Sequence, residues 1–541
     1  MPELENIEVG MRIESEGYYG TVRFVGNLQK GDTANVHSNV TWIGIEWDKP
    51  SRGKNDGSYG GVRYFSTQYA SGGSFLRPEK CNFGVSFMSA LVNRYCGPSA
   101  HTKLSEISTL AHSYMSDPSG SVDIQQRINC LSKLNVASLL GMFVRDGRND
   151  GDISPYVSNL TELDLSMNIL TKWSDIAEII NQMPQLEVLS VSDNRLQAPS
   201  QGITVLCKIR VLYLNRMEYD WPKVSCCAQL FAHIQELHAC YNQIETVDNV
   251  LFSPFTEILL VNIEGNPIAS WNALLPLGDL PQLQTLIANE CGLTSIRFPG
   301  SNTLSACFAA LESLSISRNM IADWASINEL NRLRSLSNLR FSSNPLSSKA
   351  ADARHTAVAK IARLQWCNGA AVSLGERRDA ELDYVRVYVF EWKHAGGNAN
   401  LDAPLDDSFI MEHPRYVELA RKYGPLEESE MQQKKSSALK NNLVTVQIRS
   451  KSSNSLLTKQ LPTKMTVQKL KVLVQRAFRI ADVSSIRLLH TVLKQPNDDK
   501  LHSNPLQSEN SNVHASIEMD NDLRELSFYS LENNAIIDVE W

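Results

Sequence analysis

The feature that most constrains the fold of this chain is a repeated pattern of apolar residues in its middle part. The template LxxLxLxxN, with other apolar residues replacing Leu in some copies, occurs eight times at spacings of about 23 to 28 residues. The copies begin at Leu160, Leu186, Ile209, Ile234, Ile258, Leu283, Leu311 and Leu336. A fixed period of this length indicates a stacked array, in which each repeat buries its apolar positions against its neighbours.

The period and the template are those of leucine-rich repeats, so the sequence predicts an α/β leucine-rich-repeat solenoid. Its last position is Asn in most copies, because Asn can bond turn backbone groups that would otherwise be buried without partners. This Asn is present at Asn168, Asn194, Asn242, Asn266, Asn319 and Asn344, and Met217 and Cys291 replace it. A degenerate earlier copy, LNVASLLGM from Leu134, is expected to cap the N-terminal end of the array.

Strand residues that alternate with the core positions are expected to face the concave side of the solenoid. They include Glu162, Asp164, Tyr213, Glu236, His238, Asn262, Glu264 and Arg340. This surface is polar and slightly acidic, and it holds no pair of carboxylates or Ser-His set at a catalytic spacing. Solenoids commonly use this side for partners, so a protein-binding face is favoured over a plain scaffold.

The N-terminal block alternates glycines with β-favouring residues in GTVRFVG, TWIGIEWD, GKNDGSYGGVRYF and GGSFLRPEK. This pattern predicts a small, half-open, all-β barrel. Lys54 supplies a positive charge and Asn55 a donor and an acceptor, while Trp42, Tyr59 and Phe65 could supply apolar walls. Together they suggest a groove for an acidic peptide that ends in an aromatic residue; the alternative is a turn-rich hairpin whose aromatics are only core.

These four segments, in this order and spacing, resemble a CAP-Gly domain, and GKNDG is its most specific signature. The resemblance implies a glycine-rich β domain that binds acidic C-terminal tails of the Glu-Glu-Tyr type found on α-tubulin. It implies that Lys54 and Asn55 hydrogen-bond the tail, that Trp42 and Phe65 form the aromatic cavity, and that Gly53 and Gly57 belong to the same site. One departure is the long polar stretch at residues 27–41, which affects one edge of the groove.

Several other functions are disfavoured by the sequence. Gly53-Lys54 is followed by Asn55 rather than Ser or Thr, so it does not match a nucleotide-binding loop. The net charge of -7 disfavours a general nucleic-acid binder. No run reaches the roughly 18 apolar residues of a membrane helix. Ten scattered cysteines without a CxxC pair disfavour zinc and disulfide frameworks. We therefore expect a non-enzymatic protein with no cofactor, no metal, no nucleic acid and no membrane partner.

The C-terminal block has the strand and helix order of a compact α+β domain. LVTVQIRS and SLLTKQLP read as a hairpin, TVQKLKVLVQRAF as an amphipathic helix, and SIRLLH and AIIDVEW as further strands. This order resembles a ubiquitin-like (β-grasp) domain. The chain ends in Trp541 without a diglycine tail, so the resemblance implies a fixed docking domain rather than a covalent modifier.

A length of 541 residues requires several domains. We predict a CAP-Gly domain at 1–85, a connecting segment at 86–130, the repeats with their C-terminal cap at 131–385, a linker at 386–440 and the ubiquitin-like domain at 441–541. The fold class is therefore multidomain, with an all-β barrel, an α/β solenoid and an α+β domain.

These three domains in this order resemble the tubulin-folding cofactors. The resemblance implies a cytoplasmic, cytoskeleton-associated chaperone that captures α-tubulin and takes part in assembly and dissociation of the αβ-tubulin heterodimer. The implied partners are α-tubulin and the tubulin-folding cofactors B, C and D with β-tubulin, and the ubiquitin-like domain adds the proteasome as a candidate. The alternative is a microtubule-associated adaptor that binds tubulin tails without chaperone activity.

Overall fold

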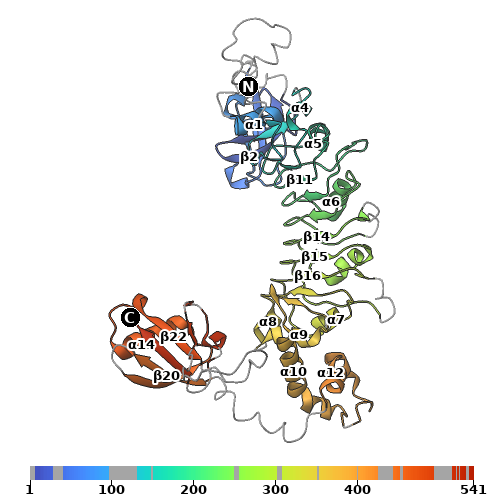
Figure 1. Cartoon of the computed structure of the whole chain (residues 1–541). Coiled ribbons are helices and arrows are strands. Elements are labelled where there is room, and N and C mark those ends of the chain that lie inside the picture. Colours follow the sequence, from blue (N-terminus) through green and yellow to red (C-terminus); the bar gives the residue numbers. More distant parts are fainter. Residues whose placement is uncertain are drawn as a thin grey trace. The chain divides into compact units, whose positions relative to one another are not determined.

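A computed structural model describes two compact units, Met1–Gly424 and Pro425–Trp541 (Figure 1). The described residues are 7–28, 40–96, 131–147, 150–248, 255–300, 307–349, 352–398, 400–424, 443–450, 455–492, 515–519, 521–522, 524–529, 531 and 535–541. The first unit contains the glycine-rich domain, the repeat array and a helical cap. The second unit contains the C-terminal domain.

The glycine-rich domain is built on an antiparallel sheet in the order β1-β2-β3-β6. The strands are β1 (Arg12–Ser15), β2 (Tyr18–Gly26), β3 (Trp42–Trp47) and β6 (Gly73–Leu76), accompanied by the hairpin β4 (Ser58–Tyr59) and β5 (Val62–Arg63) and the 3-10 turns η2 (Pro50–Arg52) and η3 (Pro78–Lys80). Alternation along β3 buries Ile43, Ile45 and Trp47 against Ile13 and Val22. The opposite face of β3 is thereby left for the site. Most of the polar stretch 27–41 lies outside the described residues.

The segment after this domain is folded where the structure describes it. Strand β7 (Val85–Ser86) pairs in parallel with β9 (Val144–Asp146), and helix α1 (Phe87–Tyr95) follows at once. Phe87, Leu91 and Val92 on this helix are buried. Residues 86–96 of the expected connecting segment therefore belong to the end of the array, and residues 97–130 lie outside the described ones.

The repeats form one sheet of eleven strands that follow one another in chain order (Figure 1). Its strands are β8 (Val136–Ser138), β10 (Glu162–Asp164), β11 (Val188–Ser190), β12 (Val211–Tyr213), β13 (Glu236–His238), β14 (Leu260–Asn262), β15 (Thr285–Ile287), β16 (Ser313–Ser315), β17 (Asn338–Arg340), β18 (Trp366–Cys367) and β19 (Ala370–Ala371). All neighbours are parallel except the last pair, β18 and β19. Every predicted repeat therefore contributes one strand, and Leu134 begins the repeat that contains β8.

Short helices connect the strands of the array. They are α4 (Ser154–Val157), α5 (Trp173–Ile180), α6 (Trp221–Ala228), the 3-10 helix η6 (Trp271–Asp279), α7 (Ala325–Leu330) and α8 (Pro345–Lys349). Their buried residues, such as Ile176, Val224 and Leu274, face the sheet and close the core. Helix α5 includes the first residues of the segment DIAEIINQMP.

The Asn at the last position of the template makes the backbone hydrogen bonds that the pattern predicts. Asn266 Nδ2 donates to the carbonyls of Ala239 and Ile263 at 2.9 and 2.8 Å, and its Oδ1 accepts from the amides of Asn242 and Ile244 at 3.1 Å. Each such side chain bonds two repeats together. Where Cys291 replaces Asn, its Sγ lies 3.4 Å from the carbonyl oxygen of Ile263 and takes over part of this role.

A helical cap closes the array at its C-terminal end, with α9 (Ala353–Lys360), α10 (Leu374–His394), α11 (Asp407–Glu412) and α12 (Tyr416–Tyr423). Lys360 is buried and donates to Asn328 Oδ1 at 3.0 Å, to the Tyr384 hydroxyl at 3.2 Å and to the Glu412 carbonyl at 3.0 Å. Burial lowers the pKa of the Lys360 ammonium group to about 8.

The cap extends into the segment that the sequence analysis assigns to a linker at 386–440. Residues 386–394 continue α10, and α11 and α12 follow before Gly424. The physical reason is the apolar content of this segment: Val389, Trp392, Tyr416 and Leu419 are buried in the cap. Residues 425–440 lie outside the described ones.

The second unit is a five-stranded mixed sheet in the order β21-β20-β24-β22-β23. Its elements are β20 (Leu443–Ser450), β21 (Leu456–Pro462), α14 (Val467–Phe478), η9 (Val483–Ser485), β22 (Arg487–Val492), β23 (Ala515–Glu518), η10 (Leu526–Tyr529) and β24 (Ala535–Glu540). The first and last strands are parallel neighbours, and Leu470 and Val474 of α14 join the core with Ile448 and Ile537. This is the β-grasp arrangement, so all three parts of the predicted fold class are confirmed.

Candidate functional site

The loop GKNDG is fixed to the edge of the sheet by backbone hydrogen bonds. The amides of Lys54 and Asn55 donate to the Gly73 carbonyl at 2.6 and 3.0 Å, and the Gly73 amide donates to the Asn55 carbonyl at 2.8 Å. Asn55 Oδ1 also accepts from the Gly57 amide at 3.1 Å. These four hydrogen bonds hold the loop against the edge of the sheet.

Two glycines of the loop are required by close approach of backbone. A Cβ on Gly53 would lie 1.9 Å from the Ser71 carbonyl oxygen, and one on Gly57 would lie 2.1 Å from the Phe65 carbonyl oxygen. Gly57 also has a φ of +89°, which side-chain-bearing residues rarely adopt. Both glycines thus shape the site that the sequence predicts, without offering side chains to a ligand.

The polar side chains of the loop divide into a structural group and an available group. Asp56 accepts from the Ser58 amide at 3.1 Å and from Arg63 at 2.6 Å, and its hydrogen bonds with Ser58 hold its pKa below the usual range. Lys54 is exposed, and within the described residues its ammonium group has no acceptor. The Nδ2 group of Asn55 likewise has no acceptor there.

Aromatic rings cover the face of the sheet beside this loop. Phe75 lies at the centre, with its ring centroid 5.3 Å from Phe65, 5.7 Å from Tyr64, 6.0 Å from Tyr59 and 6.4 Å from Phe24. We call these five residues the aromatic cluster. Phe65 is buried, whereas Tyr59 is exposed and the other three are half-buried. An apolar or aromatic group could therefore pack against their accessible ring surfaces.

A glycine of β3 makes room for the aromatic cluster. A Cβ on Gly44 would lie 2.4 Å from a Phe65 ring carbon and 2.9 Å from Phe24 Cβ. Trp42 lies two residues earlier on the same strand, and therefore on the same face. Its ring contacts Arg77, whose guanidinium carbon is 4.5 Å from the ring centroid. The structure therefore places Phe65 in the cluster and Trp42 beside a cation.

Sequence reasoning missed several residues of this face: Phe24, Gly44, Tyr64, Phe75 and Arg77. Phe24 and Phe75 occur in the segments GTVRFVG and GGSFLRP, where alternation could have marked one face of each strand. Their meeting depends on the pairing of β3 with both β2 and β6, which places Gly44 opposite both Phe24 and Phe75. That pairing is not visible in local sequence.

The concave side of the array is a second candidate surface. The rings of Tyr213 and His238 stack with centroids 4.3 Å apart, and His238 Nε2 lies 3.7 Å from Glu236. Burial lowers the pKa of His238, against the opposing effect of Glu236. His238, which the sequence predicts on this side, therefore packs on the ring of Tyr213 and lies near the carboxylate of Glu236.

A row of left-handed residues runs along one edge of the sheet, each immediately before the last template position. Arg216 lies 3.5 Å from Asp193 and 5.2 Å from the ring centroid of Tyr241, whose hydroxyl is 3.5 Å from Glu290. Arg318 then pairs with Glu290 at 2.5 Å. We call these five residues the rim row. Its charges are largely paired with one another.

Other kinds of site find no support in the described part of the chain. No group of three or more His, Cys, Asp or Glu side chains there is arranged to hold a metal ion. Among the described helices, none has the length and apolar character needed to cross a membrane. No two of the described cysteines form a disulfide bond with each other, and burial raises the pKa of several of them, such as Cys207 and Cys291, to about 11.

Together these features define a multidomain binding protein, and comparison with known proteins narrows the class. The CAP-Gly domain family matches residues 9–81. The chain is 33% identical over 550 residues to tubulin-specific chaperone E of Bos taurus, with 98% of each chain covered. It is 30% identical over 502 residues to tubulin-folding cofactor E of Arabidopsis thaliana, covering 88% of this chain and 91% of that one. The chain belongs to the tubulin-specific chaperone E family.

A solved structure is similar to part of the chain. It is the solution structure of the C-terminal ubiquitin-like domain of mouse tubulin-specific chaperone e, which is 33% identical. The similarity covers 20% of this chain and 93% of that chain, with a TM-score of 0.15.

Proposed function

We propose that this chain is a non-enzymatic, cytoplasmic tubulin-folding chaperone that captures α-tubulin by its acidic C-terminal tail. The observation that carries the proposal is that the Lys54 ammonium group and the Asn55 Nδ2 group have no acceptor among the described residues and lie in the domain that holds the aromatic cluster. Membership of the chaperone E family supports the same class of function. The tail is a ligand with matching chemistry, since it offers carboxylates followed by an aromatic ring.

In this proposal the tail carboxylates accept hydrogen bonds from Lys54 and Asn55, and the terminal ring packs on the cluster near Phe65 and Trp42. Gly53 and Gly57 hold the loop in place, so little conformational entropy is lost on binding. Arg77 adds a second cation on the same face.

Tail capture alone would give a weak and exchangeable complex, because a terminal peptide has a small contact area. We propose that the concave side and the rim row of the array contact the body of tubulin. A single chain would then link two weak contacts and raise the avidity. Assembly or dissociation of the heterodimer requires contact with the body of tubulin. In this proposal β-tubulin and cofactors B, C and D take part in the same process. The ubiquitin-like domain would recruit a further partner, with the proteasome as a candidate.

The decisive experiment is titration of the full chain with a peptide ending in Glu-Glu-Tyr. A charge-assisted hydrogen bond contributes roughly 1.5–3 kcal/mol, so Lys54→Ala should weaken binding by about ten-fold or more. Lys80→Ala is the matched control, because Lys80 is also exposed on the same domain but lies in η3. Equal peptide affinity of the Lys54 variant and the wild type would contradict the assignment of the site.

Heterodimer dissociation distinguishes the chaperone from a microtubule-associated adaptor. The full chain should bind free tubulin dimers and, with cofactor B, change their size distribution. An adaptor would bind polymer and leave dimers intact.

A further inference from the structure

The CAP-Gly domain joins the repeat array with almost no intervening chain. Phe83 is buried in the core of the CAP-Gly domain, and Val85, two residues later, already pairs with β9 of the array. The Val85 amide donates to the Phe143 carbonyl at 2.9 Å. Gly84 is the single residue between the two folded parts, which is far shorter than a flexible linker.

Gly84 is held tightly against the array. Its φ is +78°, and a Cβ there would lie 2.3 Å from the Phe143 carbonyl oxygen and 2.4 Å from Ile169 Cδ1. The ring of Phe143 also stacks on Tyr19 of β2, with centroids 6.2 Å apart. Backbone, side chain and ring contacts therefore converge at this point.

A second contact lies away from Gly84 and involves four charged residues. Arg12 binds both carboxylate oxygens of Asp48 within the CAP-Gly domain. Arg195, from the second repeat, approaches the same carboxylate at 4.0 Å and also pairs with Glu218. Burial lowers the pKa of Arg195, an effect that Asp48 opposes. A half-buried arginine thus ties Asp48 to the array.

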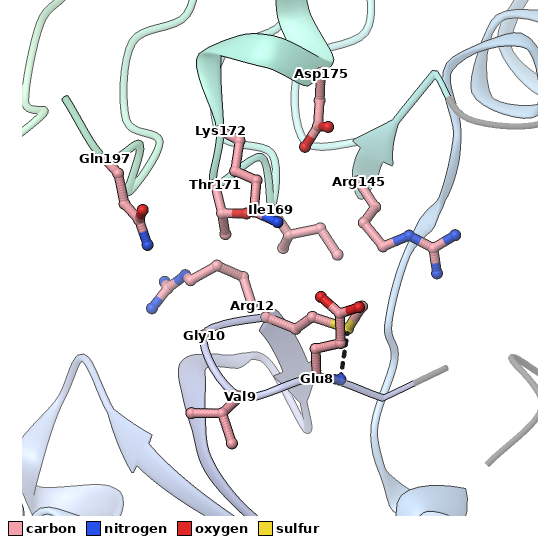
Figure 2. Close-up of a pocket in the computed structure, with 11 residues that line it drawn as sticks. Glu8, Val9, Gly10, Arg12, Arg145, Ile169, Thr171, Lys172, Asp175 and Gln197 are labelled. Carbon is pink, nitrogen blue, oxygen red and sulfur yellow. Dashed lines mark hydrogen bonds between the residues drawn. The ribbon is translucent and has the colours of Figure 1, made fainter. Parts of the chain in front are cut away.

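A small pocket between these two contacts is lined from both sides (Figure 2). Gly10 and Arg12 line it from the CAP-Gly domain, and Thr171, Lys172 and Gln197 line it from the first repeats. The two parts therefore meet at two contacts on either side of this pocket, and we call the two contacts and the pocket together the seat.

We propose that this seat is a fixed joint that sets the direction of the tail-binding groove relative to the sheet of the array, with Gly84 and Arg195 as positioning residues. The functional part of the proposal rests on the proposed function, because it assumes that one tubulin molecule binds the groove and the array at the same time. A joint that holds both surfaces in register keeps the effective concentration of the second contact high. A loosened joint leaves each contact intact but lowers the avidity of the pair.

The test uses the full chain carrying Gly84→Ala, with Gly17→Ala as the matched control. Gly17 has a similar φ of +82°, but nothing lies within 4 Å of a Cβ placed there. The rate of hydrogen exchange at the Val85 amide measures how readily the joint opens, and this measurement needs no ligand. We expect it to accelerate by about ten-fold or more in Gly84→Ala and to stay unchanged in the control. Unchanged exchange in Gly84→Ala would overturn the fixed joint.

Binding then tests the functional part. Gly84→Ala should keep its affinity for the Glu-Glu-Tyr peptide within about two-fold and lose about ten-fold or more for tubulin dimers. If exchange at Val85 accelerates in Gly84→Ala but the affinity for tubulin dimers stays at the wild-type value, the functional part is overturned. If the wild type fails to bind the peptide at all, the proposed function fails, whereas the exchange result still decides the joint.

A second pair of variants covers the case in which Gly84→Ala does not fold. Arg195→Gln removes the charge that reaches Asp48, and Arg210→Gln removes an arginine that pairs within the array with Glu187. In Arg195→Gln, hydrogen exchange at the Val85 amide should accelerate and the affinity for tubulin dimers should fall. In Arg210→Gln, neither quantity should change. Identical behaviour of the two variants in both measurements would overturn the proposal.

Discussion

Asn55 in the CAP-Gly loop and Asn266 in the array carry the same side chain in two different situations. Asn266 is buried, and its amide makes two donated and two accepted hydrogen bonds that join adjacent repeats. Asn55 is half-buried and uses its side-chain oxygen to order the loop, while its Nδ2 donor has no acceptor among the residues that the structure describes. The charges follow the same division: Lys54 has no partner in the described part of the chain, whereas Arg216 and Arg318 of the rim row are paired.

The difference separates residues that stabilise the protein from residues that are available to a ligand. A polar group satisfied inside the protein contributes to the free energy of unfolding, and its loss leaves partners unpaired. A polar group left free at the surface contributes little to stability and can contribute fully to binding. Changes in the array should therefore alter unfolding and leave peptide affinity unchanged, and changes to the polar groups that are left available beside the aromatic cluster should do the reverse.

The largest effect is expected for Leu237→Asp in the centre of the array. Leu237 is fully buried between the strands of neighbouring repeats, so the substitution places an unpaired charge in the core. The expected loss is about 4 kcal/mol, measured by thermal or denaturant unfolding. Glu236→Asp, at a neighbouring position on the polar side of the strand, is the control. An unchanged unfolding midpoint would show that the assigned register is wrong.

A smaller effect is expected for Asn266→Ala, compared with Cys291→Ala at the equivalent position of the next repeat. The first removes four hydrogen bonds to buried backbone groups, for a loss of about 3 kcal/mol. The second removes a thiol whose contacts with the Ile263 and Asn289 carbonyls are weaker, for about 1 kcal/mol. Equal losses in denaturant unfolding would contradict the hydrogen-bonding role of the asparagines.

Gly44→Ala should lower both the stability of the CAP-Gly domain and its affinity for the peptide. The added methyl group would meet the Phe65 ring at 2.4 Å and displace the aromatic cluster, which costs about 1–3 kcal/mol of local packing. Affinity for a Glu-Glu-Tyr peptide should fall by about ten-fold. Peptide titration with Gly17→Ala as a control measures this change, and retained affinity would place the ring of the ligand elsewhere.

The smallest effect is expected for Arg77→Ala, compared with Arg216→Ala in the rim row. Arg77 stacks on Trp42 and has no carboxylate partner among the described residues, so its loss should weaken peptide binding by about 1 kcal/mol. The effect should shrink as salt is added. Arg216→Ala should leave peptide affinity unchanged. Equal effects of the two variants would remove the distinction between the aromatic face and the rim row.

The sequence by itself determined the repeat array, because a period of about 25 residues with buried leucines and a terminal Asn can be satisfied only by stacking. It also determined the loop chemistry, since Gly53, Lys54, Asn55 and Gly57 are adjacent in the chain and their roles depend on local backbone geometry. Most strands of the CAP-Gly and ubiquitin-like domains followed from short-range alternation, but β1 and β23 lie in segments for which no strand was predicted.

Only the tertiary structure decided which distant residues meet. The aromatic cluster depends on the pairing of β3 with β2 and β6, which brings Phe24, Phe65 and Phe75 together across about 50 residues of sequence. The contact of Arg195 with Asp48 and the packing of the cap depend likewise on how folded parts meet. The reason is physical: hydrophobic periodicity records that a side chain is buried or exposed, but not which partner it will contact.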